Sequence, residues 1–270
     1  MSPFILGSAL AFYTLGLLGS LVGFLTKRKS ALNAATAAVG AGFLLHTAFL
    51  AVVWAAHGRF PVTTLTGAFS FFSWAITLSF FVVYFRYHIK VLGAFLLPLV
   101  TAFLLLASLI WVDHKPLPAE LQSYWVYIHA PIAFFAYAAF FVTFIAAVMY
   151  LLQAHELKTK RMSLLFYRLP SLGVCEDLFS KSLNIGLVLM TLTIITGAFW
   201  ADDKWGRFWG WDPKECMSLT TWLIYFALFH LRWANGWRGR RSAYLSIIGF
   251  IVVLFSFLGG QYIQGFHHFN

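Results

Sequence analysis

Long apolar runs make up most of the chain, and short polar segments separate them. A membrane-spanning helix needs about 20 mostly apolar residues, and eight runs satisfy this requirement. These runs lack the alternation of apolar and polar residues that marks the strands of a membrane β-barrel. The pattern therefore predicts an all-α polytopic membrane protein with a single integral membrane domain over residues 1–270. The eight predicted transmembrane helices cover residues 3–26, 33–57, 65–86, 89–110, 125–152, 182–200, 215–234 and 243–265.

The distribution of basic residues predicts the orientation of these helices. Hydrophobic residues make up 61% of the chain and charged residues only 10%, which lies outside the range of soluble domains. Most of the 19 Lys and Arg residues fall in every second loop, and loops rich in these residues face the cytoplasm. Both termini are therefore predicted to lie outside. Inner loops beside anionic membrane lipid explain the net charge of +10, and no nucleic-acid-binding motif is present.

One predicted outer loop, residues 200–215, is rich in tryptophan and reads WADDKWGRFWGWDPKE. Aromatic rings separated by glycines are expected to form a flat, rigid, apolar shelf, which suits a large planar ligand. We therefore expect Trp205, Trp209 and Trp211 to contact a bound ligand, most simply a porphyrin. The alternative is a belt of tryptophans at the membrane surface, which is the usual reason for isolated tryptophans such as Trp111 and Trp125.

The charged end of the same segment predicts the start of the next helix. Asp212 as N-cap, Pro213 at the first helical position and Glu215 at the third form a capping box. This box would attach the tryptophan segment rigidly to a helix. We therefore count Asp212 among the candidate ligand-binding residues. Arg207 and Lys214 are candidates to neutralise the propionates of a porphyrin, and solvated surface charges are an equal alternative for both.

Histidines supply candidate metal ligands. An ionisable side chain within the hydrocarbon region is costly, so the predicted intramembrane residues His46 and His230 are functional candidates. His129 and either His267 or His268 fall at the outer ends of two predicted helices. Neutral imidazole is a common axial ligand of haem iron, so four histidines could form two pairs at different depths. A hydrogen bond between helices is an equal alternative for His46 alone.

The two cysteines exclude some redox chemistry. Cys175 is predicted inside and Cys216 outside, so they would not pair, and the chain has no Cys-x-x-Cys motif. A thiol–disulfide oxidoreductase and a cysteine-based metal site are therefore disfavoured. No side-chain nucleophile is evident, and we predict no catalytic residue.

The tryptophan segment and its flanks resemble a known family. They are similar to the WWD signature of the cytochrome c assembly superfamily, and within it to the CcsA (ResC) branch of System II cytochrome c maturation. The similarity continues upstream to His46 and His129 and downstream to His267, so it covers most of the chain. The residues that carry it are Trp200-x4-Trp205-Gly-x2-Trp209-x-Trp211-Asp-Pro-Lys-Glu215, Leu219-x2-Trp222-x2-Tyr225-x4-His230-x-Arg232 and Gly236-Trp237-Arg238-Gly239.

The resemblance implies a function and a set of ligands. It implies that His129 and His267 bind haem b beside the WWD segment, that His46 and His230 bind it within the membrane, and that haem passes outward. There it would be joined through thioether bonds to the Cys-x-x-Cys-His motif of apocytochrome c, with a CcsB (ResB) partner completing the synthase. The implied location is a bacterial inner membrane or its equivalent, with the WWD segment on the periplasmic side.

Two other functions remain open. HemX-like relatives share the fold and much of the WWD segment but are linked to the control of haem synthesis. A haem transporter or chaperone without synthase activity would use the same residues. After Phe60-Pro61 the chain has Thr63-Thr64 and Thr66-Gly67 where the family usually has Ser-Asn and Tyr-Glu, which allows a divergent paralogue. An ion or proton transporter is disfavoured because no membrane-embedded Asp or Glu relay is evident.

Overall fold

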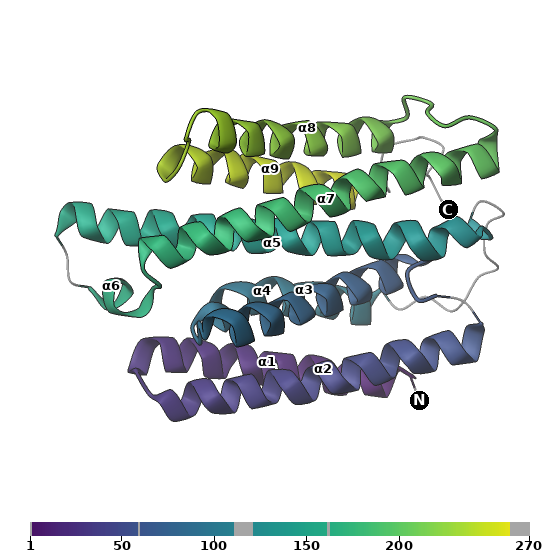
Figure 1. Cartoon of the computed structure of the whole chain (residues 1–270). Helices are drawn as coiled ribbons and strands as arrows, with labels where there is room; N and C mark the ends of the chain where they lie inside the picture. Colours follow the sequence, from purple (N-terminus) through teal and green to yellow (C-terminus); the bar gives the residue numbers. More distant parts are fainter. Residues whose placement is uncertain (1, 59, 111–120, 161–162, 260–270) are drawn as a thin grey trace. The chain divides into compact units, whose positions relative to one another are not determined.

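A computed structural model describes residues 2–58, 60–110, 121–160 and 163–259, and every regular element within these ranges is a helix. The described residues form nine helices, which confirms the predicted all-α class for this part of the chain. Figure 1 shows their arrangement. The helices are α1 (Ser2–Thr26), α2 (Lys29–His57), α3 (Leu65–Tyr87), α4 (Leu92–Leu109), α5 (Tyr124–Thr159), α6 (Leu164–Arg168), α7 (Leu172–Trp205), α8 (Pro213–Ala234) and α9 (Arg240–Gly259).

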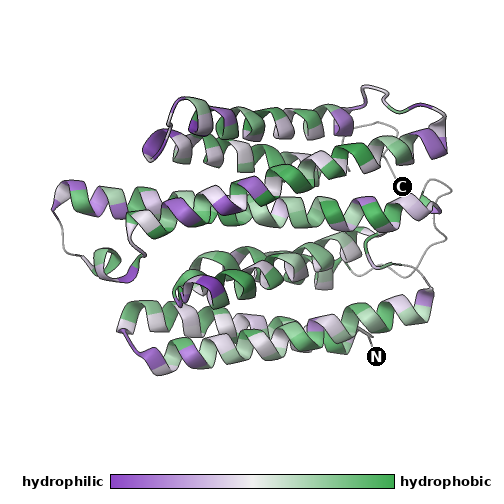
Figure 2. Cartoon of the chain, viewed as in Figure 1, coloured by the Kyte–Doolittle hydropathy of each residue, from purple (hydrophilic) through white to green (hydrophobic). Residues whose placement is uncertain are grey.

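Seven of the described helices are long and apolar enough to cross a membrane, which confirms a polytopic membrane protein. The sequence predicts eight, and the helix that falls short is α8. Its 22 residues extend for about 33 Å, so its length is sufficient. Its composition is less apolar because it contains Thr220, Thr221, His230 and Arg232. Figure 2 shows the hydrophobic colour along the middle of most helices and the hydrophilic colour mainly near their ends.

Helices α5 and α7 are longer than the sequence predicts. The segment 153–181, which separates two predicted transmembrane helices, is helical at both ends. The side chain of Ser171 caps α7 by accepting from the N–H of Val174, and Lys181 pairs with Asp177 at 2.7 Å within it. An apolar run predicts only the part of a helix that lies in lipid. Polar caps and ion pairs can extend the helix beyond that part, as they do in α7. A short helix, α6, covers Leu164–Arg168 within this segment.

The described residues fall into two compact units. Unit 1 comprises residues 1–116 and 162–169, and unit 2 comprises residues 117–161 and 170–270. The grouping of all 270 residues into one domain stays a prediction.

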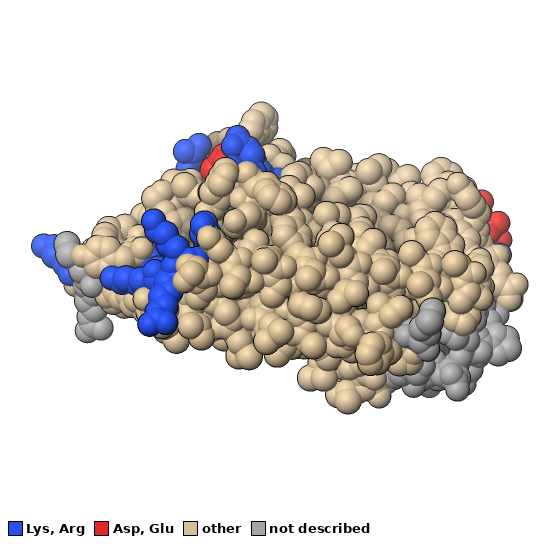
Figure 3. Space-filling view, turned by 90° about the horizontal axis from the view of Figure 1, so that it is seen from below, with Lys and Arg blue, Asp and Glu red and all other residues tan. Residues whose placement is uncertain are grey.

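Unit 1 contains α1 to α4 and α6. Helix α1 approaches α2 closely because Gly16 and Gly19 face Ala35 and Val39, where added methyl groups would lie within 3.0 Å of the opposite side chains. Helix α6 attaches through Arg168, whose Nη2 donates to the carbonyl of Gly23 at 3.3 Å. Figure 3 shows Lys and Arg side chains gathered toward one end of the face it draws, with the broad middle of that face uncharged among the coloured residues.

Unit 2 is organised around a layer of two aromatic rings between two glycines. Phe140 of α5 stacks on Tyr225 of α8 with centroids 3.6 Å apart and planes 2° apart. Gly186 of α7 lies against Phe140, and Gly249 of α9 lies against Tyr225. A methyl group on Gly186 would come within 2.6 Å of Phe140, so the close packing of these helices requires a glycine there.

The directions of the helices place three chain segments at one end of unit 2. Helices α5 and α7 run antiparallel, as Figure 1 shows, so the start of α5 meets the end of α7. Phe257, near the end of α9, contacts Phe134 at 5.9 Å, and Ser256 bonds to Tyr137. The last described residues of α9 therefore lie at the same end as the start of α5. We call this end, with Ser123 to His129 and Thr193 to Trp211, the tryptophan end.

Candidate functional site

The tryptophan end begins with contacts that fix the start of α5 to the end of α7. Ser123 caps α5 and donates from Oγ to Asp203 Oδ2 at 2.7 Å. The ring of Trp125 stacks on Phe199 with centroids 5.1 Å apart and planes 13° apart. The sequence gives no direct sign of the Ser123–Asp203 bond, because its two residues are 80 positions apart. Trp125 is thus a packing residue at the site as well as an aromatic residue near a helix start.

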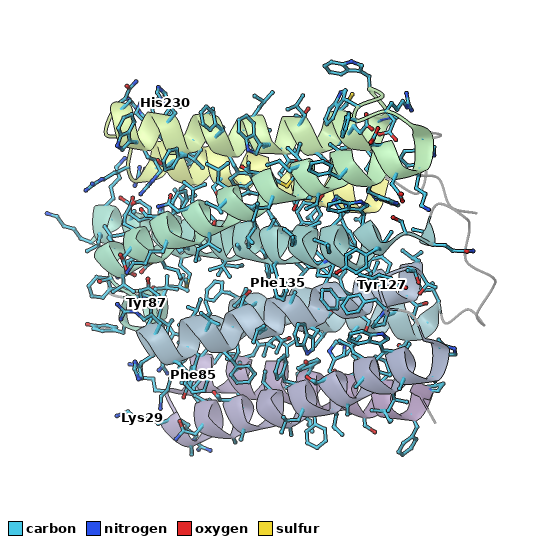
Figure 4. The ribbon with its side chains drawn as sticks, turned by 45° about the vertical axis from the view of Figure 1, so that its right-hand side comes forward. Lys29, Phe85, Tyr87, Tyr127, Phe135 and His230 are labelled. Carbon is cyan, nitrogen blue, oxygen red and sulfur yellow. The ribbon has the colours of Figure 1, made fainter. Side chains whose placement is uncertain are left out.

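His129 lies one turn further along α5, and its ring orientation is held by α7. Its Nδ1 lies 3.0 Å from the carbonyl oxygen of Thr193. Because a carbonyl only accepts, Nδ1 carries the proton and Nε2 carries the lone pair. The ring lies 5.7 Å from that of Trp200, and Figure 4 labels the nearby Tyr127. Histidines that bind metals usually donate their second ring N–H to a carbonyl or carboxylate in this way.

The tryptophan segment is half helix and half loop. Helix α7 continues through Trp205 and ends at Gly206, whose φ of 66° is left-handed. The ring planes of Trp200 and Trp205 differ by 43°, and those of Trp209 and Trp211 differ by 86°. The expectation of a flat shelf is therefore wrong for these pairs. Trp200 and Trp205 belong to α7, whereas Trp209 and Trp211 belong to the loop that follows it.

The predicted capping box at the start of α8 is confirmed. The N–H of Glu215 donates to Asp212 Oδ1 at 2.8 Å, and the N–H of Asp212 donates to Glu215 Oε2 at 3.2 Å. The same Oε2 accepts from the N–H of Gly210 at 2.7 Å. One carboxylate therefore holds both ends of the Gly210–Asp212 turn, in which Trp211 has a φ of 58°.

Polar groups of this loop suit an anionic ligand. The guanidinium of Arg207 folds over Gly210, where any side chain would overlap it. Lys214 is the second residue of α8 and follows the cap residue Asp212 by two positions. Nε1 of Trp209 is buried and has no hydrogen-bond acceptor among the described residues. A buried indole N–H normally has an acceptor, and a haem propionate would supply one. The residues at the tryptophan end therefore fit haem.

His46 is buried in unit 1 and bonds to two neighbouring helices. Its Nδ1 lies 3.3 Å from the hydroxyl of Tyr13 on α1, and its Nε2 lies 2.9 Å from Oγ of Ser70 on α3. This is the helix-to-helix hydrogen bonding that the sequence left as an alternative to ligation. Ligation of iron by Nε2 would have to replace the bond to Ser70.

His230 belongs to unit 2 and lies near the end of α8, where Figure 4 labels it. Its ring lies 6.5 Å from Phe226 and 6.4 Å from Trp233, and it has no hydrogen bond within the described residues. His46 therefore belongs to unit 1 and His230 to unit 2. His267 and His268 lie outside the described residues. Both histidine pairs therefore stay predictions.

The fold and the site together define a polytopic membrane protein with an ordered histidine and tryptophan site at one end of a helical unit. The sequence profile of the cytochrome c assembly protein family matches residues 62–267. The chain belongs to this family, as the WWD resemblance predicts. The matched region includes the whole tryptophan end and both His129 and His230.

Two relatives that match most of the chain are both cytochrome c biogenesis proteins CcsA. The chain is 29% identical over 245 residues to the cytochrome c biogenesis protein CcsA of Guillardia theta, a match that covers 83% of this chain and 81% of the relative. It is 30% identical over 241 residues to the CcsA protein of Synechococcus sp. (strain CC9902), with 80% and 79% covered. These matches support the CcsA branch of the family.

A solved structure shares the fold. The chain superposes on the cytochrome c haem lyase CcmF with a TM-score of 0.66 and 19% identity. The match covers 96% of this chain and 46% of the CcmF chain, so this chain spans less than half of that protein. At this level of identity the likeness concerns the fold alone.

Proposed function

We propose that this protein binds haem b and presents it at the outer face of the membrane for covalent attachment to apocytochrome c. The observation that carries the proposal is His129, whose Nδ1 is held by the Thr193 carbonyl beside the tryptophan segment. Membership of the cytochrome c assembly family supports it. When bound, haem supplies the vinyl groups to which the two thiols of a Cys-x-x-Cys-His motif add as thioethers.

The proposal assigns roles to this chain's own residues. His129 would bind the iron through Nε2, and His267, in the sequence that follows α9, would be the second histidine that holds it. Trp205, Trp209 and Trp211 hold the porphyrin, and Arg207 and Lys214 neutralise the propionates. Asp212 fixes the loop to α8. The reaction needs no side-chain nucleophile from this chain, because the apocytochrome provides the thiols.

A second, inner site is part of the proposal. His46 and His230 would bind haem within the membrane and supply the outer site. The exposed ring of His230, which has no hydrogen bond among the described residues, supports ligation more directly than that of His46. For this arrangement α8 is the eighth transmembrane helix, and both termini lie outside. Contact of its Tyr225 with the centre of unit 2 supports an embedded α8.

The proposed setting is a bacterial inner membrane or its equivalent, where a CcsB (ResB) partner completes the synthase. Co-expression with such a partner and an apocytochrome should yield holocytochrome c. If haem binds but no holocytochrome forms, the protein is a haem transporter or chaperone. If deletion leaves cytochromes c normal and changes the levels of haem-synthesis enzymes, it is a HemX-like regulator.

The direct test is the absorption spectrum of the full chain purified in detergent after haem-replete expression. We expect a low-spin, bis-histidine spectrum, with b-type haem quantified as the pyridine haemochrome. His129→Ala should remove the contribution of the outer site. His155→Ala is the matched control, since His155 is an exposed residue on the same helix. A haem-free wild-type preparation would overturn the proposal.

A further inference from the structure

A patch of α7 receives the imidazole of His129, and three of its residues form a socket for the ring. We propose that the carbonyl of Thr193, the hydroxyl of Thr196 and the bare backbone of Gly197 position His129 and set the electron density of its Nε2. The inference rests on the proposed function, because it assumes that His129 binds iron. These are positioning residues, since they act on the iron only through His129.

The hydrogen bonds of the socket select one tautomer. The proton on Nδ1 points to the Thr193 carbonyl at 3.0 Å, and Oγ1 of Thr196 lies 3.4 Å from the same nitrogen. The Thr196 hydroxyl donates its own proton along the helix to the carbonyl of Leu192 at 2.7 Å. Its lone pairs are therefore directed away from that bond and can accept from Nδ1. The Thr193 carbonyl can only accept, so this contact keeps the proton on Nδ1.

Gly197 makes the approach of the ring possible. A methyl group built on Gly197 would lie 2.9 Å from Cε1 and 3.1 Å from Nδ1 of His129. The first of these distances is shorter than real contacts of a Cβ atom, so an alanine would push the ring away from α7. A glycine inside a helix is otherwise unfavourable by roughly 0.5–1 kcal/mol relative to alanine. Close approach of the imidazole gives a physical reason for glycine at this position.

The socket has a chemical consequence for a bound iron. A hydrogen bond from Nδ1–H to an acceptor makes the imidazole a better electron donor through Nε2. Stronger donation stabilises ferric iron, which lowers the reduction potential of the haem. The socket therefore controls both the position of the ligand and the redox preference of the haem that it holds.

The first test is Gly197→Ala in the full chain, compared with Gly173→Ala. Both substitutions replace a glycine of α7, but a methyl group on Gly173 has no neighbour within 4 Å. We expect Gly197→Ala to weaken haem binding at the outer site roughly 10-fold or more, as is typical when the residue behind a metal ligand is changed. Gly173→Ala should bind haem like the wild type. Haemin titration followed by absorbance gives the affinities.

The second test keeps the helix and changes only the hydrogen bond. Thr196→Val removes Oγ1 at nearly constant shape, whereas Thr196→Ser retains it. We expect Thr196→Val to keep its haem but to raise the reduction potential of the outer haem, and Thr196→Ser to restore the wild-type potential. Potentiometric titration on preparations matched in haem content gives this readout, which a purely structural role would not move.

The results of these tests distinguish failure of the socket from failure of His129 as a haem ligand. If His129→Ala leaves occupancy and spectrum unchanged, the proposed role of His129 fails. If His129→Ala removes the outer haem while Gly197→Ala and Thr196→Val both match the wild type, His129 is supported as a haem ligand and the socket is refuted. Should Gly197→Ala fail to accumulate in the membrane, the potentials of the two Thr196 variants decide.

Discussion

Single residues show how differently the candidate histidines are prepared for a metal. Both ring nitrogens of His46 already have hydroxyl partners, Nδ1 of His129 has a carbonyl partner, and His230 has no hydrogen bond within the described residues. The sequence identifies these residues by type and position, but it cannot show the state of each nitrogen. That state depends on which residues of other helices lie opposite, such as Ser70 and Thr193.

We predict that Ser70→Ala strengthens haem binding at the inner site. The hydroxyl of Ser70 competes with iron for Nε2 of His46, and a buried hydrogen bond contributes about 1 kcal/mol net, so removing it should raise the affinity roughly 5-fold. Haemin titration of a His129→Ala background isolates the inner site. Ser79→Ala is the control, because among the described residues Ser79 bonds within its own helix, to the carbonyl of Ala75. Equal affinity in both variants would show that His46 is a structural residue.

A second prediction concerns the hydroxyl of Tyr225, which is buried with no hydrogen-bond partner among the described residues. Tyr225→Phe keeps the stack on Phe140 and removes an unsatisfied group, so thermal stability should be unchanged or rise by about 1 kcal/mol. Tyr137→Phe should instead lose about 0.5–1.5 kcal/mol, because Tyr137 bonds to Ser256. Thermal unfolding in detergent gives both values. A large loss in Tyr225→Phe would indicate that an ordered water or ligand satisfies its hydroxyl.

At the scale of elements, local chemistry was easier to predict from the sequence than the ends of helices. The capping box of α8 follows from four adjacent residues, and the structure confirms it. The apolar runs predict helices α5 and α7 that are too short, because apolar residues mark only the part of a helix that lies in lipid. In α7, the Ser171 cap and the Lys181–Asp177 pair belong to a polar extension of the helix. The angles between tryptophan rings depend on the Gly206 turn and on the left-handed Trp211, and residue spacing does not reveal these conformations.

The loop between α7 and α8 gives a third prediction. Glu215→Ala should release the N–H groups of Gly210 and Asp212 and cost about 1–2 kcal/mol of stability, with weaker haem binding at the outer site. Glu215→Gln should cost less because its amide oxygen still accepts. Thermal unfolding and haemin titration measure the two effects. The control is Asp177→Ala, which removes the exposed ion pair of Asp177 with Lys181, worth less than about 0.5 kcal/mol. Loop rigidity would be irrelevant if haem affinity did not change.

At the scale of the whole molecule, the sequence predicted the polytopic helical class and the family, because twenty-residue apolar runs and the WWD signature are strong signals. It did not predict the division into two units, because contacts between distant helices determine it. The number of spans depends on α8, whose polar residues lower its apolarity below that of the other long helices.

The fourth prediction tests the proposed orientation with the chain's own thiols. Cys216 is partly exposed beside the tryptophan loop, and Cys175 is fully buried near the start of α7. A membrane-impermeant maleimide added to intact cells permeable only at the outer membrane should label Cys216 and not Cys175. Cys216→Ser should abolish the signal, and Cys175 should react only after denaturation. Labelling of Cys216 solely in inverted vesicles would reverse the proposed topology.

The length of α8 bears on how many haems one chain can carry. His230 follows Pro213 by 17 residues, which corresponds to about 26 Å along a helix axis. Pro213 adjoins the tryptophan loop of the proposed outer site, whereas His230 belongs to the proposed inner site. Two ligands of one iron lie only a few ångströms apart, so one haem cannot occupy both sites. A fully loaded chain should therefore hold two haems. The pyridine haemochrome ratio should fall from near two per polypeptide to one in His129→Ala, and to one or less in His230→Ala because the inner site would supply the outer one.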